Sequence, residues 1–159
     1  MRGRCGKNDG FSLIELIVVI AMVGILTTLA VGTLQGVSVR QQKSAAAQEV
    51  QALLNQARSM ARSTTVPATV TLTQVAAAPG GSVAATIGAP VNWSRTVSLG
   101  SGRYKSVGLV GAAGATTYTF SPRGIITPSG FTMTVKDTTA GSQTVTVTVG
   151  LLGDITITQ

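Results

Sequence analysis

The sequence predicts an α+β protein in which a long N-terminal helix, half transmembrane and half amphipathic, packs on a small antiparallel β-rich head. Two observations predict this fold class. Residues 10–62 join a long apolar run to a stretch rich in helix formers. Beyond Pro67, β-branched residues alternate with Thr, Ser and Gly, and turn residues recur at short intervals. One continuous helix followed by several short strands is therefore expected.

The first half of the helix, within residues 11–39, is expected to span a membrane. Residues 16–34 carry no formal charge and would reach about 28 Å as a helix at about 1.5 Å per residue. The leader before them holds three cations and one acid, which favours a cytoplasmic N-terminus. The run is about twice as long as the apolar core of roughly 7 to 15 residues in a cleaved secretory signal. A plain membrane anchor remains an alternative.

Glu15 is the only charged residue between Gly10 and Val39. A carboxylate near the end of so apolar a segment costs a few kcal/mol to insert in lipid. A plain anchor gives no reason for that cost. Glu15 therefore indicates a partner or a task.

The second half of the helix, residues 40–63, is amphipathic. Its apolar positions recur at three- and four-residue steps, which predicts one face laid on the head. These positions are Ala46, Val50, Leu53, Leu54, Ala57, Met60 and Ala61. The helix is expected to end before Pro67, because the residue preceding a proline is biased out of the helical region.

The head, residues 64–159, is predicted to be one small antiparallel domain whose thin core needs the helix as cover. The clearest strand signal is the alternation of Val and Thr over residues 145–149. The expected strands are 68–75, 91–99, 103–110, 116–120, 131–136, 144–149 and 155–158. The Ala- and Gly-rich stretches 75–88 and 108–115 are interpreted as flexible loops, with edges ordered by neighbouring subunits as the alternative.

Catalysis finds little support in the composition. The chain has no His, and its one cysteine, Cys5, lies in the leader. This removes the commonest general base, thiol nucleophiles in the head and most transition-metal sites. The head's acids, Asp137 and Asp154, are far apart in sequence and lie in predicted turns, where Asp commonly bonds the local backbone. We expect no enzyme, no cofactor and no metal site.

The N-terminal segment KNDGFSLIELIVVI, residues 7–20, resembles the class III signal of type IV pilins and type II secretion pseudopilins. The resemblance implies that a prepilin peptidase removes residues 1–10 by cutting between Gly10 and Phe11, and that it methylates the new amino group of Phe11. It also implies that Glu15 neutralises the N-terminus of a neighbouring subunit in a filament. Burial of that pair is physically reasonable because both charges would be matched.

The C-terminal half resembles the GspH/FimT branch of this family, through the order YTFSPRG (118–124), FTMTV (131–135), VTV (145–147) and GDITI (153–157). The resemblance implies two small antiparallel sheets and a structural minor pilin or pseudopilin. It implies a single-pass inner-membrane protein, with its head in the periplasm or outside, assembled in a type IV pilus or a type II secretion pseudopilus. The implied partners are other pilins or pseudopilins, the prepilin peptidase, the assembly platform and membrane lipid.

DNA binding is the alternative function, because some FimT-type pilins bind DNA through a C-terminal Gly-Arg-x-Arg motif. The matching residues here run from Gly153 to Thr156 and contain no arginine, while Asp154 would repel phosphate. A second group of basic residues in the head, interleaved with Trp93 and Tyr104, could hold phosphates while the aromatic rings stack bases. Its members are Arg95, Arg103, Lys105 and Arg123. They are spread over separate predicted strands, so a solvated face is the favoured interpretation.

Overall fold

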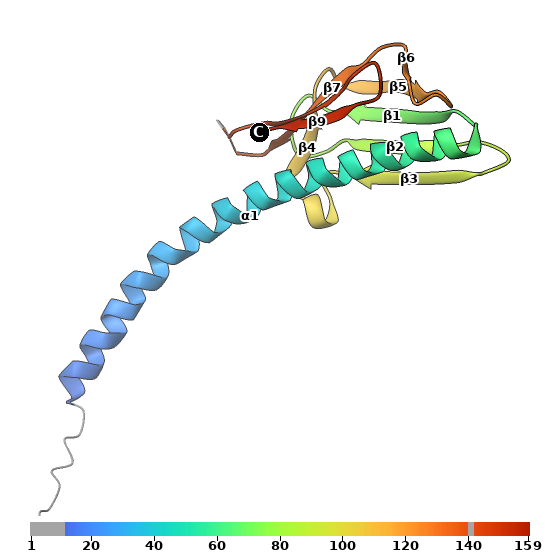
Figure 1. The fold of residues 1–159 in the computed structure, drawn as a ribbon. Helices are drawn as coiled ribbons and strands as arrows, with labels where there is room; N and C mark the ends of the chain where they lie inside the picture. Colours follow the sequence, from blue (N-terminus) through green and yellow to red (C-terminus); the bar gives the residue numbers. More distant parts are fainter. Residues whose placement is uncertain (1–11, 140–141) are drawn as a thin grey trace, which may run out of the picture. The chain divides into compact units, whose positions relative to one another are not determined.

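A computed structural model describes residues 12–139 and 142–159, and the side chains of residues 29–37 lie outside that description. The chain forms two compact units, Met1–Val37 and Ser38–Gln159, and the helix α1 (Leu13–Thr64) supplies residues to both. The second unit holds the strands (Figure 1). They are β1 (Ala68–Gln74), β2 (Ser82–Ile87), β3 (Trp93–Ser98), β4 (Val107–Val110), β5 (Gly114–Phe120), β6 (Ile126–Thr127), β7 (Phe131–Asp137), β8 (Val145–Val149) and β9 (Ile155–Thr158), with a short 3-10 helix, η1 (Gly102–Tyr104).

In the first unit, α1 begins in the predicted region, and the large apolar side chains described there are exposed. They extend from Leu13, with 76% of its surface exposed, to Leu26, with 65% exposed. Among the residues whose side chains are described, no helix is long and apolar enough to cross a membrane. The expected span over residues 16–34 stays a prediction.

The second unit contains two antiparallel sheets, as predicted. One has five strands in the order β3-β2-β1-β5-β6, and the other has four in the order β4-β7-β8-β9. In the five-stranded sheet, the central strand β1 pairs with β2 on one side and β5 on the other, so that Val70 lies opposite Ala85 and Tyr118. Tyr118 in turn stacks on Phe131 of β7, with ring centroids 4.1 Å apart, so this aromatic pair joins the two sheets.

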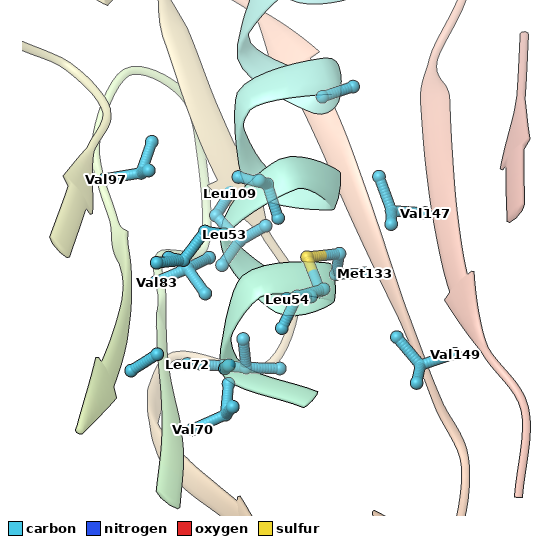
Figure 2. Packing of buried hydrophobic residues seen from close by; sticks show 14 of the residues in the cluster. Leu53, Leu54, Val70, Leu72, Val83, Val97, Leu109, Met133, Val147 and Val149 are labelled. Atoms are coloured by element: carbon cyan, nitrogen blue, oxygen red, sulfur yellow. The ribbon is translucent and has the colours of Figure 1, made fainter. Parts of the chain in front are cut away.

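The core lies where α1 covers the inner faces of the sheets. The buried apolar positions of α1 are those predicted from the helical period, with Ala47 added and Met60 only half-buried, and Lys43 is buried as well. Figure 2 shows Leu53 and Leu54 of α1 in one buried cluster with Val83 of β2 and Met133 of β7. All four side chains are fully buried. The helix thus supplies the cover that a thin β domain lacks.

The interpretation of residues 75–88 and 108–115 as flexible loops is wrong. Residues 82–87 form β2, in which every second residue is buried: Val83, Ala85 and Ile87. Residues 75–80 run along the outer edge of β4, where the Leu109 amide donates to the Gly80 carbonyl at 2.8 Å and the Val75 amide donates to the Leu109 carbonyl at 2.9 Å. Small residues are used here because backbone segments approach each other closely. The strand expected at 103–110 also begins late, because η1 occupies its first residues.

Three of the four sheet edges are occupied or short, whereas the fourth, the six-residue β3, pairs only with β2 among the described strands. The segment 75–80 covers the outer edge of β4. At the other end of that sheet, the Gln51 side chain of α1 donates to the Ile155 carbonyl of β9 at 3.1 Å. The edge strand β6 has only two residues. The outward-facing positions of the central strands are mostly Ser and Thr, including Thr69, Thr71 and Thr73 of β1.

Candidate functional site

Glu15 lies in the first turn of α1. The backbone amides of Glu15 and Leu16 both donate to the Ser12 carbonyl, at 3.0 and 3.2 Å, so Ser12 stands at the helix N-cap. Ser at the N-cap with Glu three residues later is the capping-box pattern, and a negative charge there also complements the helix dipole. This pattern was missed in the sequence, although the spacing of Ser12 and Glu15 shows it. Gly10 and Phe11 lie outside the described residues.

A buried ion pair joins α1 to the end of β7. Lys43 Nζ lies 2.9 Å from Asp137 Oδ2, and the two side chains are 5% and 2% exposed. Lys43 also donates to the Gln143 carbonyl at 2.7 Å, while Asp137 Oδ1 accepts from Ser142 Oγ at 2.6 Å and from the Thr139 amide at 2.8 Å. The pair is therefore matched in charge and in hydrogen bonds. Lys43 is thus buried, although it is not one of the apolar positions from which the buried face of the helix was predicted.

The pKa of Asp137 is lowered in this setting. Burial alone raises it, but hydrogen bonds from Ser142, Lys43 and Thr139, together with the Lys43 charge, outweigh that effect. A lowered folded-state pKa means that the pair stabilises the fold above the ordinary value of 3.8, and that this stability is lost as pH falls through the folded-state pKa.

We expect the melting temperature of the full-length chain to fall as pH drops from about 5 to 2, and the fall to be smaller in Asp137→Asn, which cannot take up that proton. Thermal unfolding of both proteins in detergent at matched pH values measures this. Asp154→Asn is the control, because the exposed Asp154 has no ion pair in the described structure. Equal acid sensitivity of wild type and Asp137→Asn would contradict the prediction.

Three of the four cations proposed for nucleic-acid binding lie near Tyr104. Arg95 projects from β3 toward α1, where its guanidinium donates to Gln56 Oε1 at 3.0 Å and lies 3.8 Å from Glu49 Oε1. The Tyr104 hydroxyl donates to Glu49 Oε2. Arg103 lies over the Tyr104 ring, 5.8 Å from its centroid, and Lys105 follows in the chain.

The two aromatic side chains of this grouping offer little open surface for base stacking. Tyr104 is 5% exposed, and Trp93 is half-buried against the core. Burial, followed by the hydrogen bond and the charge of Glu49, raises the pKa of Tyr104, with Arg103 opposing. Arg95 contacts Glu49 and Gln56, and both of these residues lie on α1. Arg123 is separate from this group and lies in the loop between β5 and β6.

Arg58, near the C-terminal end of α1, binds two loops of the second unit. Arg58 Nε donates to the Gly124 carbonyl at 3.2 Å, and Arg58 Nη2 donates to the Leu152 carbonyl at 2.6 Å. One side chain thus ties the β5–β6 loop and the β8–β9 turn to the helix. Gly153, the first residue of the segment that matches the DNA-binding motif, is buried beneath Arg58. The sequence analysis assigned no role to Arg58.

Replacing Gly153 by Ala is expected to lower the free energy of unfolding by about 1–3 kcal/mol, because the residue has φ +78 and its added Cβ would clash with the Gly124 carbonyl oxygen and lie 2.7 Å from Arg58 Nε. Chemical denaturation of the full-length chain measures the loss. Gly102→Ala is the matched control: Gly102 also has a positive φ, +53, but open space around the Cβ position. Equal losses in the two variants would show that the close approach of Gly124 and Arg58 to Gly153 contributes nothing.

Comparison with known proteins shows which family has this architecture. The family described as type II transport protein GspH matches residues 46–153, which is more than half of the chain. The chain belongs to the GspH family. The prokaryotic N-terminal methylation motif matches residues 5–31 of this GspH-family protein. The crystal structure of the type IV minor pilin FimU from Pseudomonas aeruginosa strain PAO1 shares its fold, with a TM-score of 0.55 and 18% identity over 76% of this chain and 90% of that one. No curated protein matches the chain.

Family and motif together define the class of this GspH-family protein. It is a structural minor pilin or pseudopilin, which confirms the predicted class and the predicted α+β fold. Members of this class are generally not enzymes and assemble with other pilins or pseudopilins in a filament. The methylation motif implies anchoring at a membrane, with the head facing the periplasm or standing in a pilus.

Proposed function

We propose that this GspH-family chain is stored as a single-pass inner-membrane subunit and is cut between Gly10 and Phe11 by a prepilin peptidase. The same peptidase methylates the Phe11 amine, and an inner-membrane platform then assembles the subunit into a type IV pilus or a type II secretion pseudopilus. The observation that carries the proposal is the methylation motif over residues 5–31, which contains the proposed cut and Glu15.

The exposed side chains of α1 support assembly through the helix. The large apolar residues from Leu13 to Leu26 have 45% to 76% of their surfaces exposed, so they need a cover of lipid or of neighbouring helices. Glu15 is the only charge among them. In a filament, its carboxylate would pair with the Phe11 amine of a neighbour, which stabilises both charges against burial. The force that builds the filament is burial of these apolar surfaces against each other.

The cut is tested by the intact mass and N-terminal sequence of the membrane-extracted chain after co-expression with a prepilin peptidase. We expect a mature chain that begins at methylated Phe11, and loss of that product in Gly10→Ala. Gly6→Ala is the matched control, because Gly6 is another leader glycine and its replacement should leave the product unchanged. An uncut wild-type chain would reject the proposal and leave a β domain on a plain anchor.

A further inference from the structure

Two turns at the end of the second unit expose large apolar side chains. Among the described residues 38–139 and 142–159, the large hydrophobics that are exposed are Ile125 at 36%, Leu151 at 57% and Leu152 at 70%. They lie close together, because the Ile126 amide donates to the Leu151 carbonyl at 3.2 Å and Arg58 joins both turns to α1. The exposed apolar side chains of the two turns therefore belong to one surface.

The fold does not require leucine at these positions. The β8–β9 turn is closed by the Gly150 amide donating to the Asp154 carbonyl and the Gly153 amide donating to the Gly150 carbonyl, both at 2.8 Å. Such turns favour Gly, Asn, Asp and Ser, because these residues supply the backbone conformation. Leu151 and Leu152 bury little within the chain, whereas each would contribute about 1.5–3 kcal/mol if fully buried by a partner.

Cations surround these apolar side chains. Arg62 of α1 is exposed, and its Cδ lies 3.0 Å from the position of a Cβ built on Gly124. Arg123, the residue before Gly124, is also exposed, and neither arginine has a salt bridge within the described parts of the chain. Asp154, beside the turn, is the nearby acid. We call Ile125, Leu151, Leu152, Arg62 and Arg123 the turn patch.

We propose that the turn patch docks the head of a different subunit of the same filament, through a surface that combines an apolar pocket with Asp or Glu side chains. An apolar centre with charged residues at its rim is the usual anatomy of a protein interface. A second copy of this chain fits less well, because its second unit has only the acids Glu49, Asp137 and Asp154, and the first two are already paired with Arg95 and Lys43 respectively. Nucleic acid also fits less well, because the patch has no aromatic side chain on which bases stack.

The inference rests on the proposed function, since it assumes that the chain enters a filament with other subunits. It is tested in cells that carry the complete filament system, with a photo-crosslinking amino acid at position 152 of the full-length chain. We expect a crosslink to another pilin or pseudopilin of that filament, at a peptide that contains Asp or Glu. The same amino acid at Thr158, also exposed but in β9, is the control and should give no such crosslink.

Charge reversal tests the arginine rim. Arg123→Glu is expected to reduce the crosslink at position 152 at least about tenfold, and replacing the crosslinked acid of the partner by Arg should restore it. Lys105→Glu is the matched control, because Lys105 is exposed, carries the same charge and lies beside Tyr104, away from the turn patch. Thermal unfolding of both variants shows whether the fold is retained.

Three outcomes would overturn the inference: a crosslink to a second copy, a nuclease-sensitive crosslink to DNA, or no crosslink from a chain that is processed and incorporated in the filament. In all three cases the N-terminal mass still reports on the proposed function separately. A chain that is neither cut nor incorporated would overturn both proposals. A tenfold loss for Arg123→Glu with no loss for Lys105→Glu would support docking at the turn patch.

Discussion

Replacing Lys43 by Met is expected to lower the free energy of unfolding of the second unit by about 3–5 kcal/mol, because removal of one partner leaves a buried charge without compensation. Asp137 is 2% exposed on its side chain, and Lys43 is the cation that faces it. Methionine keeps the length and the apolar stem of lysine. The loss therefore reports on the charge and its hydrogen bonds, and little of it comes from packing.

Urea or guanidinium unfolding of the full-length chain in detergent measures the effect. The double variant Lys43→Met with Asp137→Asn should recover part of the loss, since both charges are then absent, and the cycle gives the coupling between them. Lys136→Met is the control, because Lys136 is the exposed neighbour of Asp137 in β7. A loss below about 1 kcal/mol for Lys43→Met, similar to that of an exposed ion pair, would contradict the prediction.

Replacing Glu15 by Gln is expected to leave processing intact and to reduce incorporation into the filament by about a hundredfold or more. Breaking a buried charge pair costs about 3–5 kcal/mol, and every 1.4 kcal/mol corresponds to a factor of ten. Glutamine is informative because it satisfies the capping-box pattern with Ser12 as well as glutamate does. Only the charge is removed. Quantitative immunoblotting of sheared filaments, against the methylated chain in the membrane, measures incorporation.

Ser12→Ala separates the two roles of Glu15. This substitution removes the N-cap side chain, at a cost of about 0.5–2 kcal/mol to the helix, and keeps the Glu15 carboxylate. We expect Ser12→Ala to be incorporated much better than Glu15→Gln. The reverse order, with normal incorporation of Glu15→Gln and loss in Ser12→Ala, would assign Glu15 to the helix start and reject its pairing with the Phe11 amine.

The parts of the fold that were predicted correctly depend on local periodicity. The buried face of α1 follows from apolar residues at three- and four-residue steps, and β8 follows from its Val and Thr alternation. β2 was missed because its buried positions include Ala85, and alanine in a Gly-rich stretch carries almost no strand signal. Residues 75–80 are ordered by β4, which follows them by almost thirty residues, so no local pattern shows their pairing.

The site residues divide in the same way. The sequence indicated the importance of Glu15, because one charge in an apolar run is visible without a structure. It did not show that Lys43 meets Asp137, or that Arg58 binds the Gly124 carbonyl, because these contacts join residues far apart in the chain. Arg95 looked like a free cation. Its place on the helix-facing side of β3 is decided by register, which the sequence left open.

The edges of the two sheets bear on how readily the subunit aggregates before it is assembled. Strand edges with unpaired amides and carbonyls attract other strands, so crowded β domains aggregate through them. Here residues 75–80 occupy the outer edge of β4, Gln51 binds the Ile155 carbonyl of β9, and β6 is only two residues long. The edge strand β3 is the exception, with six residues that pair only with β2 among the described strands. Aggregation through strand edges should therefore be confined to β3, which sedimentation of the detergent-extracted chain at rising concentration can check.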